Sequence, residues 1–141
     1  MSFTVVVVSG GFDPVHSGHL AMFRAACALG DKLIVGVNSD DWLIRKKGKF
    51  FMNVEERKAI LKSIRWIDEV WEFDDSDDSA IQLLEDIRDI YWPYKIVFAN
   101  GGDRNETNNR ELGVEGIEFV YGVGGNHKMN SSSELLRAWV K

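Results

Sequence analysis

The segment 5–19 constrains the fold more than any other part of the chain. It starts with four consecutive valines, Val5–Val8, and such a run of β-branched apolar residues is typical of a parallel strand that is covered on both faces. Gly10 and Gly11 follow, and they allow a tight turn that a ligand can approach closely. Beyond Pro14, apolar residues recur at three- and four-residue steps. The segment is therefore expected to form a strand, a glycine turn and a helix.

Two histidines, His16 and His19, stand at the predicted start of this helix. Their three-residue spacing places both side chains on one face of the helix. The N-terminus of a helix carries unpaired N–H groups and the positive end of the helix dipole, so it attracts phosphate. Two imidazoles beside such an anion site indicate phosphate chemistry. The alternative is that they are ordinary surface histidines at a helix start.

The rest of the chain alternates between predicted strands and helices. The strands are expected at residues 32–37, 68–73, 95–99 and 117–120, with amphipathic helices between most of them and after the last. This pattern predicts an α/β fold, in which residues 1–141 form a single domain around a Rossmann-like, doubly wound parallel sheet of five strands. In such a sheet, the glycine turns after the first and fourth strands meet at the topological switch point, where ligands bind.

Charged residues gather in two of the connections. Four cations surround a glycine in the run Arg45–Lys49, which is either a solvated loop or, because it follows the carboxyl end of a strand, a loop that contacts phosphate; we favour the second. Arg57 is expected to project from the helix that starts after Asn53. The acidic cluster is interpreted as helix-start residues at a solvated turn rather than as a metal site, and it consists of Asp74, Asp75, Asp77 and Asp78.

Composition excludes several function classes. The formal net charge of −5 argues against a general nucleic-acid-binding protein. The single cysteine, Cys27, excludes an internal disulfide framework and is expected in the core. No apolar run approaches the ~20 residues needed to span a bilayer, and the N-terminus shows no signal peptide. The sequence thus predicts a cytoplasmic protein that binds neither nucleic acid nor membrane.

The run Gly10–His19 resembles the His-x-Gly-His signature of the cytidylyltransferase-like nucleotidyltransferases, because it follows a strand and a Gly-Gly-Phe-Asp turn and precedes a helix. The resemblance implies that His16 and His19 are catalytic. It also implies nucleotide-binding roles for the surrounding residues, which are Gly10, Gly11, Phe12, Asp13 and Gly18.

The segments 38–58 and 60–70 are similar to the glycerol-3-phosphate cytidylyltransferase branch of this family. Lys46 stands at the position of a lysine that contacts both substrate and triphosphate, so the resemblance implies a catalytic and substrate-binding role for it. Its neighbour Lys47 is expected to face solvent. Arg65 matches an arginine of that branch and is expected to bind substrate.

Two later motifs resemble nucleotide-binding loops of the same superfamily. The turn at 101–103 is similar to a Gly-Asp turn that contacts the nucleotide, and this similarity implies nucleotide-binding roles for Gly102 and Asp103. Its Gly-Gly-Asp form is closer to the heptose-phosphate adenylyltransferases. Before the last helix, Asn126 replaces the arginine of the cytidylyltransferases. The run from Lys128 resembles the Lys-Met-Ser-Lys-Ser loop of class I aminoacyl-tRNA synthetases, which binds pyrophosphate. This implies a catalytic Lys128 and nucleotide-binding hydroxyls on Ser131, Ser132 and Ser133.

Together the resemblances imply an enzyme that transfers a nucleoside monophosphate, with CMP favoured, from a nucleoside triphosphate (NTP) to a small phosphorylated polyol or sugar such as glycerol 3-phosphate. Mg²⁺ is expected to arrive with the NTP, so no all-protein metal site is expected. Relatives of this kind imply a homodimer. Two alternatives stay open: an adenylyltransferase of a sugar phosphate of the heptose type, and a non-catalytic nucleotide-binding module.

Overall fold

The structure, a computed structural model, describes residues 2–102, 104–125 and 131–139. Its described part holds a five-stranded sheet in the order β3-β2-β1-β4-β5, and every neighbouring pair is parallel. The strands are β1 (Thr4–Gly10), β2 (Lys32–Val37), β3 (Glu69–Glu72), β4 (Lys95–Ala99) and β5 (Ile117–Val120). The predicted doubly wound parallel sheet is confirmed, and β3 is one residue shorter at each end than expected.

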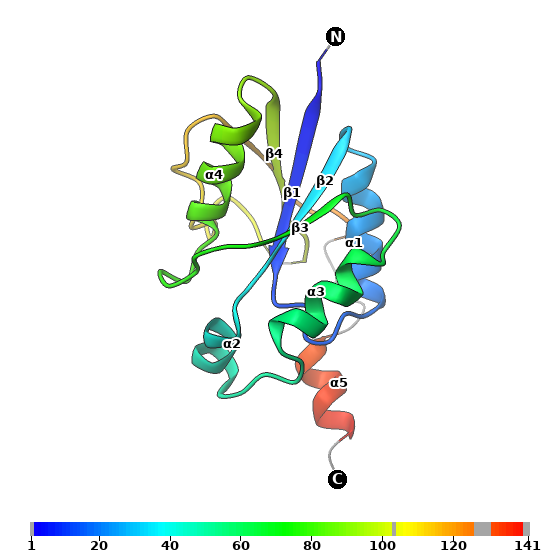
Figure 1. Cartoon of the computed structure of the whole chain (residues 1–141). Helices are drawn as coiled ribbons and strands as arrows, with labels where there is room; N and C mark the ends of the chain where they lie inside the picture. The colour runs from blue at the N-terminus through cyan, green and yellow to red at the C-terminus, as the bar shows by residue number, and fades with distance from the viewer. Residues whose placement is uncertain (1, 103, 126–130, 140–141) are drawn as a thin grey trace.

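Helices cover both faces of the sheet. Helices α1 (Ser17–Cys27) and α3 (Val54–Lys62) pack on one face, and α4 (Ile81–Tyr91) packs on the other (Figure 1). Helices α2 (Asp40–Lys47) and α5 (Ser132–Trp139) lie beyond the carboxyl ends of the strands (Figure 1). Among the described residues, no helix is long and apolar enough to cross a membrane.

The valine run of β1 forms the centre of the core. Val6 and Val8 pack in the cluster to which α1 and α3 contribute, whereas Val5 and Val7 pack in the cluster of α4. Each of the four side chains is at most 1% exposed. Full burial of a valine-sized side chain contributes about 1.5–3 kcal/mol to stability. The strand is thus held from both faces, and this fixes the position of the turn at its carboxyl end.

The basic segment after β2 is a helix, not the expected loop. The Oγ of Ser39 accepts the N–H of Trp42 at 3.0 Å and caps the start of α2. Gly48 follows the last residue with φ of +85°, a left-handed conformation that favours glycine. Acidic residues lie at the positive end of the helix dipole and basic residues at the negative end. The basic residues expected in a loop therefore stabilise the end of a helix, and they are Arg45, Lys46 and Lys47; Asp40 and Asp41 stabilise its start.

The carboxyl ends of β1 and β4 form the switch point of the sheet. The chain runs from β1 to β2 on one side and from β4 to β5 on the other. The N–H of Asn100 donates to the carbonyl of Val120 (2.8 Å), and the N–H of Val123 donates to the carbonyl of Asn100 (3.0 Å). These bonds hold the loops after β4 and β5 together. As expected, the glycine turns after β1 and β4 meet here, because Gly10 and Gly102 line the same cavity.

Candidate active site

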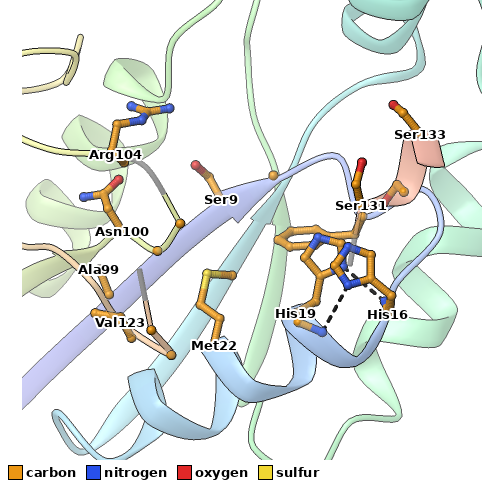
Figure 2. A pocket seen from close by; sticks show the side chains of 18 of the residues that line it. Ser9, His16, His19, Met22, Ala99, Asn100, Arg104, Val123, Ser131 and Ser133 are labelled. Atoms are coloured by element: carbon orange, nitrogen blue, oxygen red, sulfur yellow. Dashed lines mark hydrogen bonds between the residues drawn. The ribbon is translucent and has the colours of Figure 1, made fainter. Parts of the chain in front are cut away.

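A cavity of about 410 Å³ opens at the switch point (Figure 2). Its walls come from the β1–α1 turn, the end of α2, the loops after β4 and β5, and the start of α5. One end contains the two histidines and three serines at the start of α5, and the other end is rich in glycine and apolar side chains. The cavity therefore has a polar end beside a helix N-terminus and an apolar end beyond β4.

The two histidines are held by hydrogen bonds within the first turn of α1. His16 caps the helix, since its Nδ1 accepts the N–H of Gly18 at 3.1 Å. The Nδ1 of His19 accepts the N–H of His16 at 3.2 Å, and the two rings stack with their centroids 3.8 Å apart. A neutral imidazole that accepts at Nδ1 carries its proton on Nε2. Nε2 is therefore the donor nitrogen of each ring in its neutral form.

Burial and nearby positive charge keep His19 neutral. Burial of the ring, followed by repulsion from His16 and Lys47, lowers the pKa of His19 from 6.5 to about 3. At neutral pH the ring is therefore an uncharged hydrogen-bond donor.

The aromatic ring of Phe12 supports the histidine pair from the core side. Phe12 is 3% exposed, and its ring packs edge-on against His19 with the centroids 5.0 Å apart. Its φ of +52° is unusual for a residue with a side chain. Of the turn residues predicted to bind nucleotide, the ones that line the cavity are Gly10, Phe12 and Gly18.

Asp13 does not face the cavity but holds a neighbouring loop. Its buried carboxylate accepts the N–H of Phe51 at 2.6 Å and the N–H of Met52 at 2.7 Å. Gly11 also lies outside the cavity lining, and its carbonyl accepts a hydrogen bond from Arg57. In the structure, Asp13 and Gly11 support the turn from outside the cavity lining, and the nucleotide-binding roles expected for them stay predictions.

The structure exchanges the expected roles of the two lysines at the end of α2. Both lysines are exposed, but Lys47 lines the cavity, whereas Lys46 lies outside its lining with Nζ 5.8 Å from the ring centroid of Trp42. Consecutive helical residues point about 100° apart, so they face different directions. The structure thus places Lys47 rather than Lys46 at the cavity, and the role expected for Lys46 stays a prediction.

Arg57 is fully buried and joins three segments of the site, whereas the sequence analysis expected it to project from α3. Its Nε donates to Met52 O (2.9 Å), and its Nη1 donates to Gly11 O (2.9 Å) and to Asn38 O (2.6 Å). Its Nη2 donates to Asp40 Oδ1 (2.7 Å). The β1–α1 turn, the start of α2 and the loop before α3 are thus tied together.

One member of the acidic cluster is a buried anchor rather than a solvated helix-start residue. The carboxylate of Asp75 accepts the amide N–H of Asn38 (3.0 Å) and both the N–H and the hydroxyl of Ser39 (2.8 Å each). Asp78 pairs with Arg45. Asp75 therefore fixes the junction of β2 and α2. Among the described residues, no three His, Cys, Asp or Glu side chains gather in a way that could hold a metal ion.

Arg65 lies away from the cavity, contrary to the expectation that it binds substrate. It is exposed, its guanidinium lies 5.3 Å from the ring centroid of Trp66, and it is absent from the cavity lining. Helix α3 runs from the carboxyl edge of the sheet toward the amino end of β3. Arg65 follows the end of α3, so it comes to the opposite edge of the sheet.

The start of α5 completes the polar end of the cavity. The predicted residues Ser131, Ser132 and Ser133 line it, together with Gly102 from the loop after β4. The Oγ of Ser132 donates to the carbonyl of Pro14 at 2.8 Å, which ties α5 to the β1–α1 turn. The predicted residues Asp103, Asn126 and Lys128 lie outside the described residues.

The apolar end of the cavity contains residues that the sequence analysis missed: Met22, Asn100, Arg104 and Val123. A Cβ on Gly124 would lie 2.8 Å from the Cα of Met22, and the φ of Gly124 is +82°. Only glycine lets the loop after β5 approach α1 so closely. The repeated glycines after β4 and β5 were a usable signal for this wall.

Comparison with known proteins places these observations in a family. The model of the cytidylyltransferase-like family matches residues 7–115. Ethanolamine-phosphate cytidylyltransferase of Arabidopsis thaliana is 36% identical over 99 residues, which cover 70% of this chain and 22% of that protein. The bifunctional protein HldE of Shewanella amazonensis is 35% identical over 118 residues, which cover 81% of this chain and 25% of that protein. Glycerol-3-phosphate cytidylyltransferase of Bacillus subtilis is 40% identical over 65 residues, which cover 46% of this chain and 50% of that protein. The chain thus spans a quarter to a half of these relatives.

Solved structures share the fold at low sequence identity. A bifunctional NMN adenylyltransferase/ADP ribose pyrophosphatase from Francisella tularensis, complexed with AMP and a manganese ion, has a TM-score of 0.71 and 16% identity, and the match covers 97% of this chain and 41% of that one. A lipopolysaccharide core biosynthesis protein from Thermoplasma volcanium has a TM-score of 0.63 and 21% identity, with coverages of 85% and 96%. These likenesses support the α/β architecture.

Proposed function

The chain belongs to the cytidylyltransferase-like family of nucleotidyltransferases, and from this premise we propose that it transfers CMP from CTP to a small phosphorylated polyol or sugar and releases pyrophosphate. The observation that carries the proposal is the stacked pair His16 and His19, which lines the cavity at the N-terminus of α1 with both Nδ1 atoms engaged. In the proposal, Nε2 of each ring is the nitrogen that donates to phosphate oxygens.

In the proposed reaction, a phosphate oxygen of the acceptor attacks the α-phosphorus of CTP. A new P–O bond forms there, the bond to the bridging oxygen of the β-phosphate breaks, and pyrophosphate leaves with that oxygen. The enzyme forms no covalent intermediate, so catalysis consists of positioning the reactants and stabilising the charge that builds on the phosphates. Mg²⁺ enters bound to the phosphates of the substrate.

The polar end of the cavity offers groups for each part of the triphosphate. His16 and His19 donate to oxygens of the α- and β-phosphates, where the leaving group develops charge. The ammonium of Lys47 adds positive charge from α2. The hydroxyls of Ser131–Ser133 and the N-terminus of α5 suit the β- and γ-phosphates. We assign Lys128 to the same task, because it precedes these serines in the chain.

Two relatives support the cytidylyl group and the phosphorylated acceptor. The proteins from Arabidopsis and Bacillus are named as cytidylyltransferases of ethanolamine phosphate and of glycerol 3-phosphate. A second candidate is an adenylyltransferase of a sugar phosphate, which the Gly-Gly-Asp form of the turn at 101–103 favours. Both candidates use the same histidine pair and differ in the base and the acceptor.

Pyrophosphate release by the full chain tests the proposal. Each of CTP, ATP, GTP and UTP is incubated with Mg²⁺ and with a panel of phosphorylated polyols and sugars. We expect pyrophosphate from CTP that depends on both Mg²⁺ and the acceptor. Binding of NTP without pyrophosphate release for any acceptor would instead identify a non-catalytic nucleotide-binding module.

A further inference from the structure

Beyond the apolar side chains, the far wall of the cavity carries an arginine, Arg104, that the proposed mechanism does not use. Figure 2 shows Arg104 and Asn100 across the cavity from His16 and His19. A nucleotide whose phosphates meet the histidines and the serines of α5 extends its base toward the opposite end. That end is formed by glycines and by the side chains of Met22 and Val123, which suit the faces of a planar base.

A buried carboxylate fixes the guanidinium of Arg104. Its Nη1 donates to Oε1 of Glu111 at 3.1 Å, and Oε2 of the same carboxylate accepts the N–H of Ala80 at 2.9 Å, at the start of α4. Glu111 is 3% exposed, so it cannot follow a moving partner. Within the described part of the chain, Arg104 has no second side-chain partner. Its Nε and Nη2 groups remain as a pair of parallel donors for a ligand.

Asn100 lies on the same wall and adds an acceptor. Its backbone is held on both sides by the hydrogen bonds to Val120 and Val123, and its side chain is buried. The amide donates through Nδ2 to the carbonyl of Phe98 at 3.4 Å. Its Oδ1 is thus the atom that can accept an N–H from a ligand. The wall therefore combines two adjacent donors with one acceptor.

This pattern complements cytosine better than the other bases. The edge of cytosine carries two adjacent acceptors, O2 and N3, followed by the N4 amino donor. Adenine offers a single acceptor beside its amino group, and uracil turns an N3–H donor toward the arginine. Guanine has two adjacent acceptors, O6 and N7, but its amino group lies on another edge. Each mismatch removes at least one of these hydrogen bonds and therefore lowers affinity.

We propose that Arg104 selects the base of the substrate in favour of cytosine over adenine, and that Glu111 is the positioning residue that fixes its guanidinium. The proposal rests on the proposed nucleotidyl transfer. Base selection by Arg104 would decide between the two candidate activities, because the cytidylyl and adenylyl reactions place different bases against this residue.

The test compares kcat/KM for CTP and for ATP with one acceptor in the full chain. Replacing Arg104→Met should lower kcat/KM for CTP by about 10- to 100-fold, the size of a bidentate arginine–base contact, and should change the value for ATP little. Arg110→Met is the matched control, because Arg110 is exposed on the same loop and outside the cavity lining. It should leave both values unchanged.

A second variant separates the charge of Arg104 from its geometry. Arg104→Lys keeps the charge but lacks the parallel donors, so it should lose the preference for CTP as the methionine variant does. Inhibition by inorganic pyrophosphate should be unchanged in both variants, because pyrophosphate binds at the histidine end. Retained preference in Arg104→Lys, or weakened pyrophosphate inhibition, would assign Arg104 to a phosphate and overturn the proposal.

The positioning role of Glu111 has its own readout. Glu111→Gln should reduce the ratio of the CTP and ATP values of kcat/KM, whereas a residue that only caps α4 would lower the melting temperature and leave that ratio intact. A wild-type protein that prefers ATP would overturn the role of Arg104 while nucleotidyl transfer stands. If no NTP is turned over, the proposed function fails, and the Kd values for CTP and ATP then test the base selection alone.

Discussion

The segments that follow β1 and β2 both contribute to the polar end of the cavity, but they place their side chains in different ways. In the β1–α1 turn, His16 and His19 are fixed by hydrogen bonds to backbone groups within four residues. In the segment 38–57, Lys47 reaches the cavity because the rotation of α2 about its own axis turns this side chain toward it. That rotation is fixed by Arg57 and Asp75, which come from α3 and from the loop before α4.

The difference shows that local contacts orient the histidines, whereas long-range contacts position α2. The turn carries its own geometry, so its histidines are expected to keep their arrangement even if a distant contact is lost. The position of α2 depends on buried polar groups that are remote in sequence. Changes in the two segments should therefore differ in kind, with losses of catalysis from the turn and losses of stability from the anchors of α2.

The largest effect is expected from the anchor. Arg57→Met should lower the free energy of unfolding by about 3–5 kcal/mol, because it leaves Asp40 and three carbonyls without their buried partner. Urea unfolding measures this value. Arg65→Met, an exposed arginine after the same helix, is the control and should stay within about 0.5 kcal/mol of wild type and keep its activity. Equal stability of the two variants would show that Arg57 does not anchor the site.

Next in size is the loss of a histidine donor. His19→Gln and His16→Asn should each reduce kcat by roughly 10²–10³-fold, as removal of one donor to a developing charge does. Asparagine is a good N-cap, so His16→Asn keeps the start of α1 while removing the Nε2 donor. Nucleotide Kd should change much less than kcat. A folded variant with nearly normal kcat would exclude that histidine from catalysis.

A smaller effect separates the two lysines. Lys47→Ala should lower kcat/KM for CTP at least about 10-fold, because a hydrogen bond to a charged group contributes about 1.5–3 kcal/mol. Lys46→Ala should be nearly silent, since Lys46 packs on Trp42 outside the cavity. The reverse order would restore the role that the family resemblance implies for Lys46, and equal mild losses would indicate a diffuse basic surface.

At neutral pH the last effect is absent, because it concerns acid stability. The folded pKa of His19 is about 3, below its ordinary value of 6.5, so between these values the unfolded chain binds a proton that the folded chain does not. Stability should therefore fall as the pH falls through this window, by up to about 1.4 kcal/mol per pH unit from this group. His19→Gln should flatten the pH dependence of urea unfolding. An unchanged slope would show that the ring is charged in the folded protein.

Much of the fold follows from local sequence patterns. The valine run, the apolar strand cores and the amphipathic spacing of 81–91 predicted elements that the structure confirms within about a residue. Sequence patterns also located the β1–α1 turn and the serines of α5. In each case the signal lies in consecutive residues, because the structure they form is local.

The remaining site residues depend on contacts that no local pattern shows. If residues 45–49 formed a loop, the sequence would give no reason to choose between Lys46 and Lys47. The helical geometry of α2 turns the two side chains in different directions, so only Lys47 lines the cavity. Arg57 is a charged helical residue of a kind that usually faces solvent, yet it shares the face of buried Leu61, four residues later. That spacing was a usable signal. Arg104 faces the cavity because Glu111 holds it.

The histidine pair allows the most direct test of the site. NMR of the protein with ¹⁵N-labelled histidine reports the protonation of each ring nitrogen, before and after addition of Mg²⁺ and CTP. We predict that His19 is neutral with its proton on Nε2 at neutral pH, and that the Nε2 signals of both His16 and His19 shift when the nucleotide binds. A proton on Nδ1 of His19, or Nε2 signals that do not respond to CTP, would contradict the proposed active site.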